Sequence, residues 1–126
     1  MPFEDNSVDE IFAENSVYKI SREEWVGLRK EMARVLKPGG EIGIVVHDLE
    51  YVYKAFLDNK DGKRWTWWWA TIYGMQEDQY DFKKNGFTYE RLVADFWEVG
   101  MTNFRREEYT EEEYGESYIY FVCNKL

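Results

Sequence analysis

The sequence SREEWVGLRKEMARVLKPGGEIGIVVHD, which occupies residues 21–48, decides the fold. Ser21 and Glu24 have the spacing of a capping box, in which each side chain bonds a backbone N–H at the start of a helix. Apolar residues then recur at the three-, four- and seven-residue intervals that place side chains on one helical face; they are Trp25, Leu28, Met32, Val35 and Leu36. The stretch predicts an amphipathic helix.

A turn and a buried strand follow this helix. Residues 37–40, KPGG, end the helix, because proline has no N–H to continue the ladder and glycine lets the backbone reverse. Residues 42–46, IGIVV, are apolar on both strand faces, which is typical of a central parallel strand that helices cover on both sides. His47 and Asp48 come directly after the strand.

The remaining segments suggest an alternation of strands and helices. Periodicity and turn residues predict a strand at 8–13, a helix at 49–57, a helix capped by Thr88 that stops at Gly100, and strands at 103–109 and 118–123.

A tryptophan-rich segment at 65–73 has the most unusual composition. Helical spacing puts Trp65, Trp68, Trp69 and Tyr73 on one stripe, whereas strand spacing puts alternate tryptophans on one face, and we favour a helix. Such a cluster suits the wall of a substrate pocket, a sugar-stacking platform, the core or a subunit interface.

Four short motifs carry a resemblance to a known family. They are PFEDNSVDEI at 2–11, RVLKPGG at 34–40 with its strand, YGMQ at 73–76 and NGFT at 85–88. Together they resemble the class I S-adenosylmethionine-dependent methyltransferases, most closely the branch of predicted methyltransferases of glycan or lipid metabolism. The likeness covers nearly the whole chain.

The resemblance implies an α/β fold, a partial Rossmann-like class I methyltransferase sheet of about four strands with flanking helices. The strands correspond to the last four of the family's seven, in the order first, second, final, penultimate, and the final pair forms an antiparallel hairpin. The family's opening strand, Gly-rich loop and helix do not precede Met1. We therefore expect one domain, residues 1–126, that represents the C-terminal half of the fold.

The resemblance also places the cofactor. It implies that S-adenosylmethionine lies beside the loop after the first strand, at Ala13, Glu14 and Asn15. The residues themselves leave open that Asn15 is only a turn residue at a helix entry. The family usually continues into a Glu-His pair, where this chain has Tyr18-Lys19.

His47 and Asp48 are the candidate catalytic residues. A histidine beside an aspartate can act as a general base that the carboxylate orients. The alternatives are a loop histidine and an aspartate that caps the next helix. Asp48 matches the family, but His47 stands where the family usually has proline. The predicted substrate-binding residues are Asp48, Trp65, Trp68, Trp69 and Tyr73.

Composition excludes several classes of function. With 25 acidic and 16 basic residues the net charge is −9, which argues against nucleic acid as a partner. One histidine and one cysteine do not supply the ligands of a zinc site, and Cys123 fits the core better than a nucleophile's position. No apolar run approaches the ~20 residues of a membrane span. We expect a cytoplasmic protein without a metal.

Two functional hypotheses follow. The first is a methyltransferase, or part of one, that is catalytically incomplete alone, binds S-adenosylmethionine weakly or not at all, and acts on a small-molecule, glycan or lipid-precursor acceptor. The alternative is a non-catalytic interaction or dimerisation module derived from a methyltransferase.

The sequence also predicts a homodimer. The strand at 8–13 would have an unpaired edge, and 19% aromatic residues are difficult for a small monomer to bury. The interface would contain Val8, Ile11 and Phe12, the tryptophan segment, or both. The competing expectation is a monomer in which residues 1–7 or the tryptophan segment cover the edge.

Overall fold

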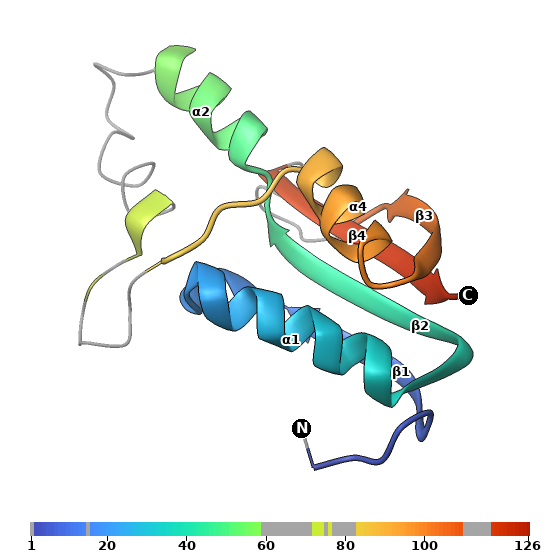
Figure 1. Ribbon diagram of the computed structural model, residues 1–126. Helices are drawn as coiled ribbons and strands as arrows, with labels where there is room; N and C mark the ends of the chain where they lie inside the picture. The colour runs from blue at the N-terminus through green and yellow to red at the C-terminus, as the bar shows by residue number, and fades with distance from the viewer. Residues whose placement is uncertain (1, 15, 59–71, 75, 77–82, 110–116) are drawn as a thin grey trace.

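The computed structural model describes residues 2–14, 16–58, 72–74, 76, 83–109 and 117–126 (Figure 1). Within them the elements run, in chain order, β1 (Val8–Glu14), the 3-10 helix η1 (Val17–Lys19), α1 (Arg22–Val35), β2 (Leu36–His47), α2 (Leu49–Asp58), α4 (Tyr89–Trp97), β3 (Met101–Glu107) and β4 (Tyr118–Lys125).

The four described strands form one mixed sheet in the order β1-β2-β4-β3. β1 and β2 are parallel, whereas β4 lies antiparallel to both of its neighbours. The predicted α/β class, strand order and antiparallel final pair are therefore confirmed. Because β1 and β2 are parallel, their carboxyl ends lie at the same edge of the sheet.

The capping box predicted for α1 is present in full. The Glu24 backbone N–H donates to Ser21 Oγ at 3.1 Å, and the Ser21 N–H donates to Glu24 Oε1 at 3.2 Å. The helix ends at Val35, where the Leu36 N–H still donates to the Met32 carbonyl. The caps thus fix both ends of the helix.

The predicted turn at 37–40 differs from the structure, because β2 begins at Leu36 instead of residue 42. Val8 pairs with Leu36, but two residues further along β1 Glu10 pairs with Glu41, so the ladder contains an irregularity. Gly39, with a φ of +82°, supplies a left-handed conformation inside it. Proline and glycine here interrupt the ladder within a strand rather than separate a helix from a strand.

The third strand also begins earlier than predicted, at Met101 instead of residue 103. Gly100 takes a φ of +85° after α4, so the chain enters the sheet at once and Met101 is buried. Asn103, at a φ of +55°, lies in a register shift between Thr102 and Arg105. This shift breaks the simple alternation on which the sequence prediction depended.

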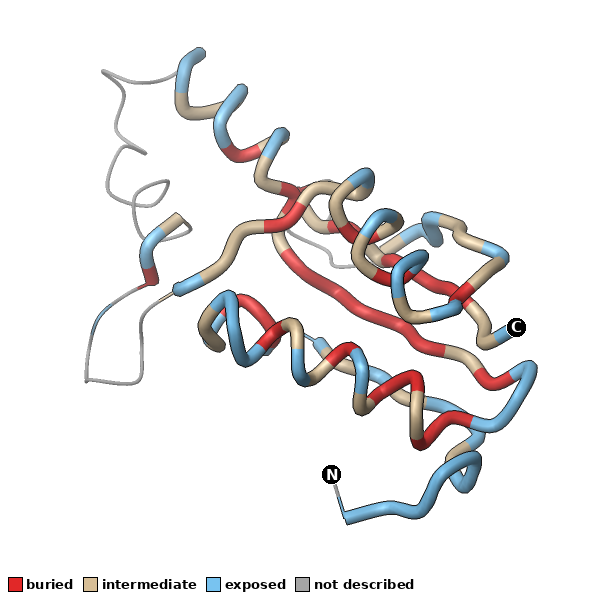
Figure 2. The backbone as a smooth tube through the Cα atoms, in the orientation of Figure 1, coloured by how far each residue is buried: buried red, intermediate tan, exposed pale blue. Residues whose placement is uncertain are grey.

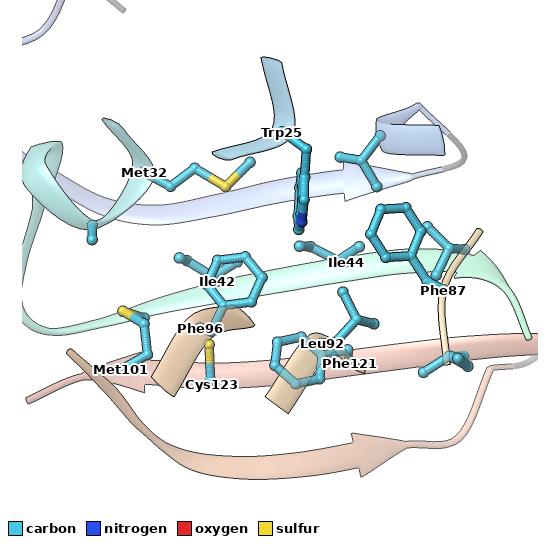
Figure 3. Packing of buried hydrophobic residues seen from close by; sticks show 14 of the residues in the cluster. Trp25, Met32, Ile42, Ile44, Phe87, Leu92, Phe96, Met101, Phe121 and Cys123 are labelled. Carbon is cyan, nitrogen blue, oxygen red and sulfur yellow. The ribbon is translucent and has the colours of Figure 1, made fainter. Parts of the chain in front are cut away.

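Of the described helices, α1 and α4 both pack on the same face of the sheet, whereas the sequence predicted helices on both sides of β2. The buried cluster takes alternate residues of β2 and β4 and residues of both helices (Figure 3). Trp25 of α1 meets Phe96 of α4 edge-on, with ring centroids 5.7 Å apart, and Phe96 stacks on Phe121 at 5.5 Å. Cys123 is fully buried in this cluster, as expected.

The opposite face of the sheet is built around Gly43. A Cβ atom at this position would lie 3.0 Å from the Phe12 ring and 3.4 Å from the Tyr120 ring. The two rings meet edge-on at 5.9 Å, while Val45 and Val122 are buried. β2 is therefore buried along most of its length (Figure 2), and of the described helices α1 and α4 cover one of its faces.

Candidate functional site

Three segments meet at the carboxyl edge of β1 and β2. η1 follows β1, α2 follows β2, and residues 83–87 lie beside both. The N–H groups of Lys84 and Asn85 donate to the Tyr18 carbonyl, at 2.7 and 3.0 Å. The Leu49 N–H donates to the Phe87 carbonyl at 2.9 Å. The loops after the two parallel strands are thus bound to a segment far along the chain.

A cavity of about 210 Å³ lies between these segments. Its walls are mainly aromatic and aliphatic, with polar atoms concentrated on two lysines, an asparagine and a histidine. The described lining residues are Tyr18, His47, Leu49, Val52, Tyr53, Ile72, Tyr73, Lys83, Lys84, Asn85, Gly86 and Phe87. Apolar walls with a few polar groups are typical of small-molecule sites.

A row of aromatic rings crosses the same edge; we call Tyr18, His47, Tyr118 and Tyr109 the edge stack. The His47 and Tyr118 rings are stacked with centroids 4.2 Å apart, and Tyr118 and Tyr109 are 5.0 Å apart. The Tyr18 and His47 ring centroids are 6.4 Å apart. The Tyr109 hydroxyl donates to Glu14 Oε1 at 2.9 Å, so the row ends at the carboxyl end of β1.

His47 is neutral at physiological pH. The pKa of its imidazole is lowered to about 4, mainly by burial and secondly by the positive charge of Lys83, while a hydrogen bond to the Ser117 backbone opposes the shift. Nδ1 is buried and has no hydrogen-bond partner among the described residues. A base with so low a pKa accepts a proton weakly near neutral pH. His47 is therefore better suited to shape the cavity than to act as a strong general base.

Lys83 brings positive charge to the cavity. Its Nζ lies over the Tyr18 ring, 4.4 Å from the centroid, in a cation–π contact. Its backbone N–H donates to the Tyr73 carbonyl at 3.0 Å, which fixes the residue next to the predicted substrate-binding Tyr73. The cation is thus held at the cavity rather than at the end of an extended surface side chain.

Asp48 is engaged in structural contacts. Its Oδ1 accepts from the Glu50 N–H at 3.1 Å, its Oδ2 lies 3.4 Å from Arg106 Nη2, and its N–H donates to the Ser117 carbonyl at 2.7 Å. The first contact is the helix-capping alternative that the sequence left open. Asp48 is not among the described residues that line the cavity. Its chemical role stays a prediction.

The other predicted site residues divide into two groups. Ala13 is half-buried and Glu14 is exposed at the end of β1, beside the edge stack, and Tyr73 lines the cavity. Asn15, Trp65, Trp68 and Trp69 lie outside the described residues.

Sequence reasoning assigned no role in the site to Tyr18, Lys83, Phe87 or Tyr118. The predicted strand order set the strand of Tyr118 beside that of His47, but only the structure shows the antiparallel register that places the two residues opposite each other.

Two further searches cover the described residues. They contain no group of three or more His, Cys, Asp or Glu side chains that could hold a metal ion. None of their helices is long and apolar enough to cross a membrane.

Comparisons with known proteins agree with this architecture. A family model for a methyltransferase domain matches residues 1–44. No curated protein sequence matches the chain.

Three solved structures illustrate the likeness in fold. An S-adenosylmethionine-dependent methyltransferase from Thermotoga maritima has a TM-score of 0.64 and 18% identity over 100% of this chain and 59% of its own. One from Methanosarcina mazei has a TM-score of 0.59 and 18% identity, over 100% of this chain and 63% of its own. The third is a chain of the complex between the Haloferax volcanii Trm112 methyltransferase activator and a methyltransferase. It has a TM-score of 0.62 and 17% identity, over 98% of this chain and 57% of its own.

The chain thus spans 57% to 63% of the length of these three structures. At these identities the likeness concerns the fold, which is the Rossmann-like α/β fold of S-adenosylmethionine-dependent methyltransferases in part. The findings support a methyltransferase-related domain and do not favour the alternative of a non-catalytic interaction module.

Proposed function

We propose that this methyltransferase-related domain forms the acceptor side of an S-adenosylmethionine-dependent methyl-transfer site. The observation that carries the proposal is the cavity beside His47, which opens at the carboxyl edge of β1 and β2. Open α/β sheets bind their ligands at this edge. Tyr73, which the sequence predicts to bind substrate, is part of its wall.

The described residues fit one end of the cofactor rather than all of it. Pockets that enclose a drug-sized ligand measure about 300–1,000 Å³, and the cavity of about 210 Å³ is smaller. Ala13 has a small side chain near the end of β1, and the exposed Glu14 carboxylate can accept hydrogen bonds from amino or hydroxyl groups. We propose that Ala13 and Glu14 flank the cofactor, together with Asn15, which lies outside the described residues. We also propose that this chain alone binds S-adenosylmethionine weakly.

A bound S-adenosylmethionine would supply an electrophilic methyl group: its methyl–sulfur bond would break as the acceptor bond forms, S-adenosylhomocysteine would leave, and the proton of a protonated acceptor would pass to solvent. The chain's own residues position the acceptor. Tyr18, Tyr73 and Phe87 enclose it, and the neutral His47 adds no charge that would repel a cationic methyl donor. Holding two reactants in line is itself a large part of catalysis in reactions of this kind. Asp48, through Glu50 and Arg106, would hold the start of α2 in place beneath the site.

The test is a titration of the ¹⁵N-labelled chain with S-adenosylmethionine, followed by NMR. We expect shifts at Ala13, Glu14 and Tyr18 with a dissociation constant above about 100 μM, as suits a partly enclosed ligand. Lys30, exposed on α1, serves as the reference that should not move. No shift at the end of β1 would contradict the cofactor position. Binding in the low micromolar range would refute weak binding by the chain alone.

We also propose that the chain forms a homodimer through the free edge of β1. In the described sheet β1 pairs only with β2, and Phe12 is 50% exposed. Val8 and Ile11 pack partly against the core, so Phe12 is the best placed of the three predicted interface residues. Light scattering coupled to size exclusion should give twice 15.3 kDa for the native chain and about 15.3 kDa for Phe12→Lys. A native mass of 15.3 kDa across the micromolar range would exclude the dimer. The cytoplasmic location stays a prediction.

A further inference from the structure

We infer that Arg91 is a positioning residue for the cavity: from outside, it holds residues 85–87, which form part of the cavity wall. We call these residues, which lead toward α4, the wall segment (Figure 1). Arg91 lies in the first turn of α4 and is not among the described residues that line the cavity. It therefore acts on a bound ligand through the wall segment. That this ligand is a methyl acceptor rests on the proposed function, whereas the hold on the wall does not.

The guanidinium group of Arg91 contacts all three residues of the wall segment. Its Nη1 donates to the Gly86 carbonyl at 2.6 Å, and its Nη2 donates to Asn85 Oδ1 at 3.1 Å. Its central carbon lies over the Phe87 ring, 4.8 Å from the centroid. A planar fork with two donors fixes the orientation of the groups that it binds, which a single ammonium group does not. One side chain thus holds a carbonyl, an amide and a ring of the wall.

Arg91 is itself anchored to the core face of the sheet. Asp95, one turn later in α4, places its Oδ2 3.5 Å from Arg91 Nε. The same oxygen accepts from Trp25 Nε1 at 2.8 Å, and Oδ1 lies 3.2 Å from Arg29 Nη1. The Asp95 side chain is only 16% exposed, so salt screens these contacts less than it screens surface ion pairs. The fork is therefore fixed relative to both α1 and α4.

The wall segment transmits this hold to the cavity. The Asn85 N–H donates to the Tyr18 carbonyl, and the Phe87 carbonyl accepts from the Leu49 N–H. A Cβ atom at Gly86 would lie 2.7 Å from Leu49 Cδ2, so the backbone at Gly86 already packs closely on a residue of the cavity lining. An outward movement of the wall segment would break these contacts and widen the cavity.

A second hollow makes the wall segment dependent on Arg91. It has a volume of about 440 Å³ and lies between α1 and α4. Its described lining includes Arg91 and shares Asn85 with the cavity. Because Asn85 is only partly buried and borders both hollows, hydrogen bonds fix its position more than packing does. Loss of the bonds from Arg91 should therefore displace this end of the wall.

His47 can report the state of the wall. It is the only histidine in the chain, so one NMR signal follows its titration. Tyr118 stacks on it from β4, and the other titratable groups of the described lining are Tyr18, Tyr53, Tyr73, Lys83 and Lys84. Its pKa is lowered to about 4 mainly by burial and secondly by Lys83, which lies two residues before the wall segment. A displaced wall admits water and moves Lys83, and both changes raise the pKa.

The first test compares the native chain with Arg91→Met, which keeps the aliphatic stem and removes the donors. The pKa of His47 should rise from about 4 to at least about 5 in this variant, since burial decreases. Arg22→Met is the matched control, because Arg22 is exposed on α1 and lines the same second hollow. It also removes one positive charge, and it should leave the pKa unchanged. Arg91→Lys keeps the charge but loses the fork, so it should give an intermediate pKa.

Hydrogen exchange of the Leu49 N–H provides the second test, because this group donates to the wall segment and not to Arg91. Its exchange should become about tenfold faster in Arg91→Met, the effect of one lost hydrogen bond to a charged group. Arg22→Met should change it less than about twofold. A loss of stability in urea with unchanged Leu49 exchange would mean that Arg91 stabilises the domain without holding the wall.

Four outcomes would overturn the inference: an unchanged His47 pKa in Arg91→Met, unchanged Leu49 exchange, equal changes in Arg22→Met, or fully native behaviour of Arg91→Lys. If circular dichroism shows that Arg91→Met is unfolded, Arg91→Lys decides with the same two measurements. Neither measurement needs the cofactor, so a failure here is separate from a failure of methyl transfer. A chain that meets these expectations but does not bind S-adenosylmethionine would retain this inference and lose the proposed function.

Discussion

The face of the sheet beneath α1 and α4 and the carboxyl edge of the same sheet use aromatic residues in opposite ways. On the face, Trp25, Phe96 and Phe121 are fully buried, and their rings contact one another. At the edge, the rings of the edge stack carry polar groups, and one of them, His47, has a buried nitrogen that finds no hydrogen-bond partner in the described part of the chain. The first arrangement stabilises the fold, whereas the second maintains a titratable group in an unfavourable environment.

Phe87 connects the two regions. It contacts Trp25 with ring centroids 5.1 Å apart, and its other side lines the cavity. Because Phe87 belongs both to the core and to the cavity wall, its ring is held rigidly. Rigid walls suit a pocket that must position a small ligand. The comparison therefore predicts large stability effects on the face and small ones at the edge, where pH and ligand effects should dominate.

Truncation of Trp25 should have the largest effect. The side chain is fully buried, meets Phe87 and Phe96, and donates from Nε1 to Asp95 Oδ2 at 2.8 Å. Trp25→Ala should lower the free energy of unfolding by about 4 kcal/mol, enough to unfold a marginal domain. Urea denaturation measures the change. Trp97→Ala, at a position 70% exposed, is the control and should cost less than about 0.5 kcal/mol. Equal losses of unfolding free energy in Trp25→Ala and Trp97→Ala would contradict a stabilising role for the buried rings of this face.

His47 should make stability depend on pH. Its pKa is about 4 in the folded chain and near 6.5 when unfolded, so the unfolded state binds the proton first as pH falls. Stability is fully present above pH 6.5 and declines toward pH 4, by about 2 kcal/mol after allowance for partial exposure.

The control for this decline is His47→Gln, which has no proton to bind in that range. Urea titrations of both chains between pH 7.5 and 4.5 should show a steeper loss for the native one. Parallel pH profiles would mean that His47 titrates normally, and the edge would then be as unstrained as the face.

The cap of α4 should have a moderate effect. Thr88 Oγ1 accepts from the Arg91 N–H at 3.2 Å at the start of the helix. Thr88→Ala should cost about 1 kcal/mol in thermal or urea unfolding, because one backbone donor loses its partner. Thr88→Ser keeps the hydroxyl and should recover most of the loss. A larger loss than that of Trp25→Ala would show that the cap, not the ring packing, dominates this face.

Removal of the Tyr109 hydroxyl should have the smallest effect on stability. Its hydrogen bond to Glu14 is exposed, so Tyr109→Phe should cost about 0.5 kcal/mol while the ring still packs on Tyr118. The same variant frees the Glu14 carboxylate, so S-adenosylmethionine should bind at least as well as in the native chain. A loss near that of Trp25→Ala would mean that the edge stack is part of the core after all.

Local signals predicted much of the fold. The capping residues Ser21, Glu24 and Thr88 need only neighbouring residues and are where the sequence placed them, whereas α4 ends at Trp97 and Gly100 lies in the turn that follows. Neighbouring residues do not determine the strand order, which was predicted from the family resemblance. Strand starts were less accurate, because the irregularities near Gly39 and Asn103 depend on pairing with distant strands.

The site was harder to predict for a similar reason. His47 was found because histidine beside aspartate suggests acid–base chemistry, but that pattern missed the partners that define its state. Tyr18, Lys83 and Tyr118 lie far from it in sequence and meet it only through the loops and β4. Burial and a neighbouring cation, which set the pKa of His47, are properties of the folded chain and leave no local pattern.

The irregularity in β2 near Gly39 determines how the chain tolerates insertions. The ladder already departs from regular pairing between Leu36 and Glu41, so one added residue there enlarges an existing protrusion and leaves Ile42 opposite Ile11. One residue added between Ile42 and Val46 would instead move every later side chain of the strand to the other side. Homologous chains should therefore vary in length before Glu41 and keep a constant length after it.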